Sequence, residues 1–168
     1  MEIRSITDMS LSELEALCTF IGEPGYRAKQ ILSWIYEKGA TAFDEMSNLS
    51  KNFRKQLEEK YQVFQTKVDS IIQTSDSTEK FLIHLSDENV IECVLLREGR
   101  KITACVSTQV GCAMACQFCA SGLLGLERNL TVGEIVEQAL HIKNHLRHDE
   151  HLTNIVFMGI GEPLKNYD

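Results

Sequence analysis

Hydrophobic and polar residues recur with two different periods along the chain. In the first third, apolar residues return every three or four positions, which is the spacing of an amphipathic helix. A first helix is expected after a capping box formed by Ser12 and Glu15, a second over 26–38, and a third after Ser50. The pattern therefore predicts a small helical domain over residues 1–64.

From residue 65 onward, apolar and polar residues alternate one by one, as they do in strands with one buried face. The alternating segments are 68–74, 80–85 and 90–97, and the polar residues between them favour turns. Consecutive strands joined by short turns pair as a β-meander. We therefore expect residues 65–100 to form a meander that leads into the rest of the chain.

The pattern changes again at residue 101. A strand over 101–108 leads into a cysteine-rich loop, and a helix capped by Thr131 and Glu134 follows. Residues 154–158 then form a short apolar strand of the buried parallel type. Strand, helix and strand make a βαβ unit, so residues 101–168 are predicted to begin a parallel α/β core. Because two parallel strands enclose no core, we expect an N-terminal portion of a longer protein.

Composition suits a folded protein, with 43% hydrophobic residues and no apolar run long enough to span a bilayer. The N-terminus lacks a secretory signal, and the clustering of the six cysteines suits a reducing compartment. A cytoplasmic protein without a membrane partner is therefore expected.

The net charge is −7, but residues 26–67 carry +3. That stretch is either a face that meets nucleic-acid phosphates or a solvated helix surface.

Three cysteines, Cys112, Cys116 and Cys119, stand at C-x3-C-x2-C spacing. Three thiolates this close can each bind one iron of a [4Fe–4S] cluster and leave the fourth iron open for a substrate or cofactor. The segment resembles the hallmark motif of the radical S-adenosylmethionine (SAM) enzymes. The alternative is a structural zinc site, which needs a fourth ligand such as Cys105.

Gly161 and Glu162 follow the last predicted strand, at the edge where parallel α/β folds bind ligands. Glycine allows close backbone approach, and a carboxylate accepts hydrogen bonds from an ammonium group. Taken alone, the Gly-x-Gly-Glu segment is typical of a turn. Its place after the cysteines resembles the radical-SAM motif that holds the amino group of SAM. Phe118 matches the aromatic position near the adenine of SAM, with ordinary core packing as the alternative.

Longer stretches narrow the resemblance, and together they cover essentially the whole chain. These stretches are similar to segments of the RlmN-type dual-specificity 23S rRNA and tRNA adenine-C2 methyltransferases, and they follow one another in the same order. A sister group methylates C8 of the same rRNA adenine, and Pro163 after the glutamate favours the C2 branch. The matching segments are 26–31, 105–112, 118–121, 125–130 and 157–163.

The resemblance implies a radical-SAM (β/α) barrel, incomplete in this chain, that uses a [4Fe–4S] cluster and two SAM molecules per turnover. One SAM methylates a cysteine of the enzyme, and a radical made from the second activates that methyl group for addition to C2 of adenosine. Implied partners are 23S rRNA, tRNA and a reductase or flavodoxin-type electron donor. In this family the methyl-carrying cysteine lies past Asp168, so the chain alone is expected to be inactive.

Two residues match the family's release step. Cys105 matches the resolving cysteine, which attacks the methyl-carrying sulfur and frees the RNA; a core thiol or a metal ligand are its alternatives. Glu92 interrupts an apolar strand and matches the proton acceptor. Its carboxylate either faces solvent or is buried with a raised pKa. Cys18 and Cys93 match no family role and are expected to be structural.

Other polar and aromatic positions favour ordinary structure. His141 and His145 stand i, i+4 on a predicted helix, but no third ligand lies at motif spacing, so a solvated helix end is expected rather than a metal site. Trp34 is expected in the core of the helical domain rather than as a base-stacking platform.

A rival hypothesis of another class is a non-catalytic RNA-binding module. In it, Cys105 joins the three motif cysteines in a zinc knuckle, whose binding energy would stabilise a small fold. The Gly161–Glu162 loop discriminates between the two hypotheses, because a zinc knuckle has no use for it.

Overall fold

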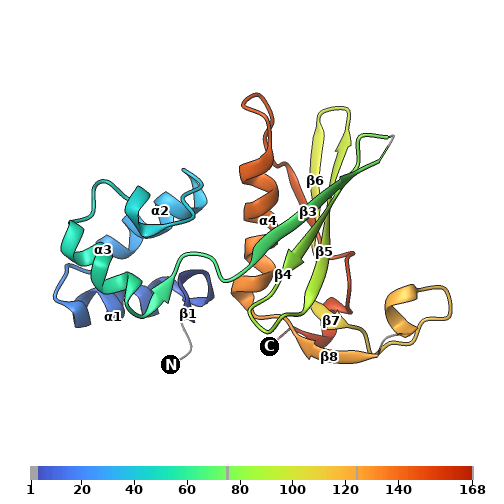
Figure 1. The fold of residues 1–168 in the computed structure, drawn as a ribbon, viewed down its shortest axis with the longest axis horizontal. Coiled ribbons are helices and arrows are strands. Elements are labelled where there is room, and N and C mark those ends of the chain that lie inside the picture. Colours follow the sequence, from blue (N-terminus) through green and yellow to red (C-terminus); the bar gives the residue numbers. More distant parts are fainter. Residues whose placement is uncertain (1–3, 75, 124, 168) are drawn as a thin grey trace. The chain divides into compact units, whose positions relative to one another are not determined.

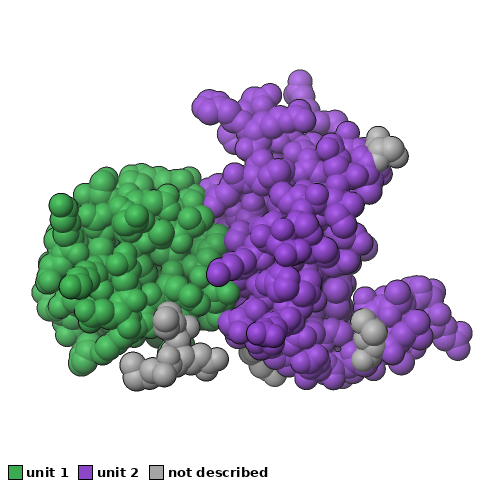
Figure 2. Space-filling model, in the orientation of Figure 1, with its two compact units in different colours: residues 1–65 green, residues 66–168 purple. Residues whose placement is uncertain are grey.

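The computed structural model describes residues 4–74, 76–123 and 125–167. Contacts divide the chain into two compact units, Met1–Gln65 and Thr66–Asp168 (Figure 1, Figure 2). The boundary lies next to the end expected for the helical domain. The strands of the meander and those that follow them lie in the same unit.

Unit 1 is mainly helical and has its own core. Apolar residues at helical spacing meet inside it, with Leu14, Ile31 and Phe53 fully buried. Its elements are β1 (Arg4–Ser5), the 3-10 helix η1 (Ile6–Asp8), α1 (Leu11–Ile21), α2 (Arg27–Tyr36), η2 (Phe43–Glu45), α3 (Lys51–Glu58) and β2 (Tyr61–Gln62). Parallel pairing of β1 with β2 joins the beginning and the end of the unit.

The start of α1 corrects the prediction. Ser10, not Ser12, is the N-cap: its hydroxyl accepts a hydrogen bond from Glu13 N at 3.3 Å, and the Glu13 carboxylate accepts one from Ser10 N at 2.8 Å. The sequence Ser-Leu-Ser-Glu-Leu-Glu contains two overlapping capping boxes. The earlier box prevails because it lengthens the helix without a further nucleation cost.

The other two helices begin where the pattern indicates, and Ser50 caps α3 by accepting a hydrogen bond from Phe53 N at 3.2 Å. Trp34 is only half-buried, which corrects its expected place in the core. Its indole N–H donates to Asn48 Oδ1 at 2.5 Å, and the Lys38 ammonium lies 3.8 Å from the ring centroid. The ring stays at the rim because its N–H needs a polar partner.

Unit 2 is a five-stranded sheet with one helix packed along it (Figure 1). Its main elements are β3 (Lys67–Gln73), β4 (Glu79–His84), β5 (Val90–Glu98), β6 (Lys101–Cys105), α4 (Val132–His145) and β9 (Asn154–Val156). The strand order is β3-β4-β5-β6-β9, antiparallel except for the parallel pair β6 and β9. Ile142 of α4 packs with Phe81, Ile91 and the other core residues of the sheet. The predicted mixed α/β class is confirmed.

Unit 2 departs from the predicted pattern at two places. β6 ends at Cys105, and the chain then forms β7 (Gln109–Gly111), which pairs antiparallel with β8 (Leu126–Asn129). β9 is an edge strand, and Ile155 is 50% exposed, so the predicted burial of this strand is wrong. Two 3-10 helices, η3 (Ala120–Leu123) and η4 (Pro163–Lys165), complete the unit. Within the described ranges, the helices are too short or too polar to cross a membrane.

Candidate functional site

The three motif cysteines lie on the loop that joins β7 to β8. Figure 1 shows this loop extending away from the body of unit 2. Its two ends are held together, because Cys112 N donates to Gly125 O at 2.8 Å. Gly111 has φ +74°, and a Cβ there would lie 1.9 Å from Gly125 O. Only glycine therefore fits at the base of the loop.

The three cysteines are free thiols with different exposure: Cys112 is buried, Cys119 is half-buried and Cys116 is exposed. Hydrogen bonds from the backbone of Ser121 and Gly122 lower the pKa of Cys119. A lowered pKa favours the thiolate, which is the form that binds metals. The three thiols on this loop are a donor set that fits a cluster in which each cysteine binds a different iron.

The four cysteines of the zinc alternative are not gathered around one point. Across residues 4–74, 76–123 and 125–167, no three His, Cys, Asp or Glu side chains lie close enough together to hold a single metal ion. Cys105 lies in β6, apart from the loop, and burial raises its pKa. The three cysteines of the loop supply one thiolate for each of three irons of a [4Fe–4S] cluster, as their C-x3-C-x2-C spacing predicts.

Phe118 projects from the cysteine loop and is 93% exposed, so its core-packing alternative is wrong. Met114 and Leu123 of the same loop are also exposed. Neighbouring exposed apolar side chains are typical of a surface that contacts a ligand or another part of a protein. The loop therefore offers apolar contacts as well as thiols.

Both helix histidines have a partner within unit 2. His141 Nε2 lies 2.9 Å from Thr66 Oγ1, and burial lowers the pKa of this ring. His145 Nε2 lies 2.6 Å from Glu79 Oε2, and the ring packs edge-on against Phe81 at 5.2 Å. His141 is half-buried, so the predicted solvated helix end is wrong for it, whereas His145 is exposed as that prediction expects.

The Gly161–Glu162 loop follows β9 and packs against segment 106–109. Backbone hydrogen bonds of 2.9 to 3.2 Å join the two segments. A Cβ on Gly159 would lie 2.6 Å from Ser107 Oγ, and one on Gly161 would lie 2.7 Å from Gln109 Cβ. Close approach of the backbone was predicted for a ligand, but here the glycines are required for packing within the protein.

Glu92 and Cys105 lie on the same face of the sheet, opposite to the face that packs on α4. Val94 pairs with Cys105, and Glu92 is two residues before Val94, so the two site residues are diagonal neighbours about 7–8 Å apart. The Glu92 side chain is 41% exposed, and its Oε2 lies 3.0 Å from Lys80 Nζ. The buried form of this carboxylate is thus excluded, and Cys105 is half-buried rather than a core thiol.

Ser107 joins the parts of the site, and the sequence pattern did not single it out. Its hydroxyl donates to Glu92 O at 2.6 Å and accepts from Ile160 N at 2.9 Å. The Gln138 amide of α4 bonds its backbone N and O at 2.7 and 3.0 Å. The one signal in the sequence is its position between Cys105 and Cys112, inside a segment that resembles the family.

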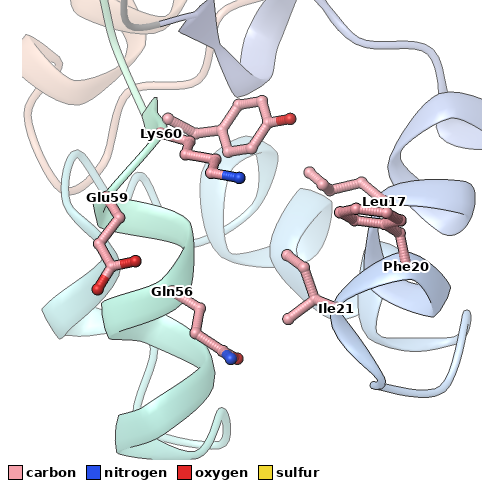
Figure 3. A pocket seen from close by; sticks show the side chains of 7 residues that line it. Leu17, Phe20, Ile21, Gln56, Glu59 and Lys60 are labelled. Carbon is pink, nitrogen blue, oxygen red and sulfur yellow. The ribbon is translucent and has the colours of Figure 1, made fainter.

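Unit 1 contains a separate pocket of about 290 Å³. Figure 3 shows Leu17, Phe20 and Ile21 of α1 on one side of the pocket. On the other side are Gln56 of α3 and, after the end of that helix, Glu59 and Lys60. Phe20 is 83% exposed. The remaining lining residue is Tyr61. The pocket thus combines two aromatic rings with an ammonium, an amide and a carboxylate.

Comparison with known proteins gives consistent relatives. Residues 5–63 match the family model described as "Ribosomal RNA large subunit methyltransferase N-terminal domain". "Probable dual-specificity RNA methyltransferase RlmN" of Rhodopirellula baltica is 47% identical over 161 residues, which cover 96% of this chain and 43% of that protein. "Dual-specificity RNA methyltransferase RlmN" of Nitratidesulfovibrio vulgaris (strain DP4) is 46% identical over 96% of this chain and 47% of that protein.

A solved structure has the same fold. The crystal structure of a radical SAM methyltransferase from Sphaerobacter thermophilus matches with a TM-score of 0.93 and 42% identity, over 98% of this chain and 49% of that one. The chain spans about half the length of the curated relatives it matches.

Proposed function

Because the chain belongs to the RlmN family of RNA methyltransferases, we propose that it forms the N-terminal part of a radical-SAM enzyme that methylates C2 of adenosine in 23S rRNA and tRNA. In this proposal, residues 1–64 contact RNA, 65–100 extend the core, and 101–168 begin an incomplete radical-SAM barrel. The observation that carries it is the β7–β8 ladder, from which the cysteine loop projects and against which the Gly161–Glu162 loop is fixed.

We assign the residues that would bind the cluster and SAM from the chemical groups that they offer. Cys112, Cys116 and Cys119 would hold three irons of a [4Fe–4S] cluster, and the Gly161–Glu162 loop would bind the SAM amino group. Phe118 would offer its exposed ring to the adenine. When bound, the cluster would supply the electron that cleaves SAM. The Thr108 hydroxyl lies beside Gly161, buried and without a hydrogen-bond partner among the described residues, so the protein leaves a polar group unsatisfied at this loop.

Glu92 and Cys105 would act at the RNA. We assign Glu92 as the acceptor of the C2 proton, and Lys80 holds its carboxylate on the sheet face that carries Cys105. Cys105 would attack the sulfur of the methyl-carrying cysteine, form a disulfide with it and release the methylated base. The proposed reaction also needs groups that this sequence does not contain. They are the methyl-carrying cysteine, a second SAM in each turnover and a reductase or flavodoxin-type electron donor.

The RNA contact of unit 1 is assigned to the pocket in Figure 3. Aromatic rings such as Phe20 and Tyr61 stack on unpaired bases, and an ammonium such as that of Lys60 binds phosphate. The +3 charge of residues 26–67 fits this role. Methylation of C8 by the sister enzymes is the second candidate, and Pro163 is the residue that favours C2.

The test is anaerobic reconstitution of the chain with iron and sulfide, followed by EPR of the reduced protein with and without SAM. We expect a [4Fe–4S]⁺ signal that shifts when SAM is added. Cys116→Ala should abolish the signal, and Cys93→Ala, at a buried thiol outside the loop, should retain it. Bound zinc in place of a cluster would overturn the proposal in favour of the zinc knuckle. A cluster signal that does not change when SAM is added would overturn the assignment of Gly161 and Glu162 to SAM binding in this chain.

A further inference from the structure

Three side-chain amides fasten the Gly161–Glu162 loop to the β7–β8 ladder. Glu162 N donates to Gln109 Oε1 at 2.9 Å, and Gln109 Nε2 donates to Asn129 Oδ1 at 2.8 Å. Asn129 Nδ2 donates to Lys165 O at 3.3 Å. Asn166, which follows the loop, donates from Nδ2 to Thr108 O at 2.8 Å and to Leu130 O at 3.0 Å. We call Gln109, Asn129 and Asn166 the amide latch.

Gln109 is the centre of the amide latch. Gln109 is 1% exposed, so its side-chain amide needs both a hydrogen-bond donor and an acceptor inside the protein. It finds them in Glu162 N and Asn129 Oδ1, on two different segments. The contact also fixes Gly161, whose φ is +105° and whose missing Cβ leaves room for the Gln109 side chain. The loop backbone at Glu162 is therefore held by a buried side chain whose acceptor and donor are both used.

The same ladder fixes the base of the cysteine loop. Gln109 belongs to β7, which leads to Cys112, and Asn129 belongs to β8, which leaves the loop. The two strands are paired directly between these residues, since Gln109 lies opposite Asn129. Movement of Glu162 relative to the β7–β8 ladder, the base of the cysteine loop, would break the amide latch. The latch thus sets the spacing between the two segments.

We propose that Gln109 is a positioning residue that sets the Gly161–Glu162 loop at the correct place beside the cysteine loop for binding the amino group of SAM. The inference rests on the proposed function, in which these two segments hold SAM and the cluster. Recognition of an ammonium group depends on the placement of its acceptors, because a displacement of about 1 Å already weakens a hydrogen bond strongly. Gln109 would act through Glu162 and would not touch the cofactor.

The test compares Gln109→Leu with Gln109→Glu. Leucine removes both hydrogen-bonding groups at similar size, whereas glutamate keeps the acceptor for Glu162 N. Hydrogen exchange at the Glu162 amide is measured by NMR in the 168-residue chain. We expect Gln109→Leu to speed this exchange by about tenfold or more, which corresponds to the loss of one hydrogen bond, and Gln109→Glu to restore most of the protection. Unchanged exchange in Gln109→Leu would overturn the proposal.

Gln138→Leu is the matched control, because Gln138 is also a fully buried glutamine but bonds Ser107 and not the Glu162 backbone. It should lower the thermal midpoint while leaving the Glu162 amide more protected than in Gln109→Leu. Equal loss of protection in the two variants would mean general destabilisation and would overturn the specific role.

A second readout uses the reconstituted chain. We expect Gln109→Leu to raise the SAM concentration needed for the half-maximal EPR shift by about tenfold, with the iron content unchanged. Gln109→Glu should bring that concentration part of the way back to the wild-type value. An unchanged SAM dependence in Gln109→Leu would overturn positioning. If the wild-type chain forms a cluster that shows no response to SAM, the assignment of Gly161 and Glu162 to SAM has failed, and with it the positioning role of Gln109 toward SAM.

Discussion

Burial divides the cysteines into two chemical groups. Cys18 and Cys93 are enclosed in the cores of their units, and burial raises their pKa to about 11 and about 12. Cys116 is exposed, and backbone hydrogen bonds lower the pKa of Cys119. Because the thiolate is the reactive form, the two groups differ both in access and in nucleophilicity.

Alkylation of the native, metal-free chain should follow this division. We expect Cys116 and Cys119 to react with iodoacetamide about tenfold or more faster than Cys18 and Cys93 near neutral pH, read residue by residue by mass spectrometry. In denaturant all six cysteines should react at similar rates. Fast labelling of Cys93 in the native chain would contradict the described burial.

Asp87 gives the molecule a measurable acid dependence. The Arg128 guanidinium, 2.6 Å away, lowers the pKa of this carboxyl to about 2 from its ordinary 3.8. A lowered pKa in the folded state stabilises the fold above about 3.8, and the contribution is lost as pH falls towards about 2. Asp87→Asn should therefore lower the thermal midpoint near neutral pH but not at the acid end. A difference that stays constant with pH would contradict this.

At the scale of elements, a capping motif in the sequence predicted the start of a helix correctly where no second capping motif overlapped it. Thr131 was predicted as the cap of a helix, and it caps α4 by accepting from Glu134 N at 3.2 Å. The start of α1 was misplaced because two capping boxes overlap there. The β7–β8 ladder was missed, since its strands are short and the cysteine loop separates them. Pairing across such a loop leaves no periodic pattern in the sequence.

The cap of α4 can be tested by itself. Thr131→Ala removes the hydroxyl acceptor for Glu134 N, and we expect a loss of about 0.5–2 kcal/mol in the free energy of unfolding, measured with urea. Thr131→Ser keeps a capping hydroxyl and should lose much less. Equal destabilisation by both substitutions would show that the methyl group, not the cap, matters.

At the scale of the whole molecule, unit 1 has a hydrophobic core of its own. Its core includes Leu14, Ile31, Ile35 and Phe53, all fully buried. The amide latch illustrates the opposite case, because Gln109 and Glu162 are 53 residues apart in sequence. Helical spacing in the sequence therefore predicts the three helices of unit 1, whereas the parts of the site held by distant hydrogen bonds emerge only from the structure.

Residues 1–65 should fold as a separate polypeptide. We expect a cooperative thermal transition by far-UV circular dichroism, although a domain of this size is only marginally stable. Phe53→Ala should abolish the transition, since removing a buried phenylalanine costs about 3–5 kcal/mol. Lys51→Ala, at an exposed position of the same helix, should leave it nearly unchanged. A gradual, non-cooperative melt of the wild-type piece would contradict independent folding.

The exposed edge of β9 affects how the protein behaves in a crowded solution. Its outer side has no strand partner among the described residues, and Ile155, Phe157 and Met158 beside it are exposed. Unpaired backbone groups next to apolar side chains invite strand-by-strand association between molecules. We therefore expect this edge to be the part of unit 2 through which separate molecules associate as protein concentration rises.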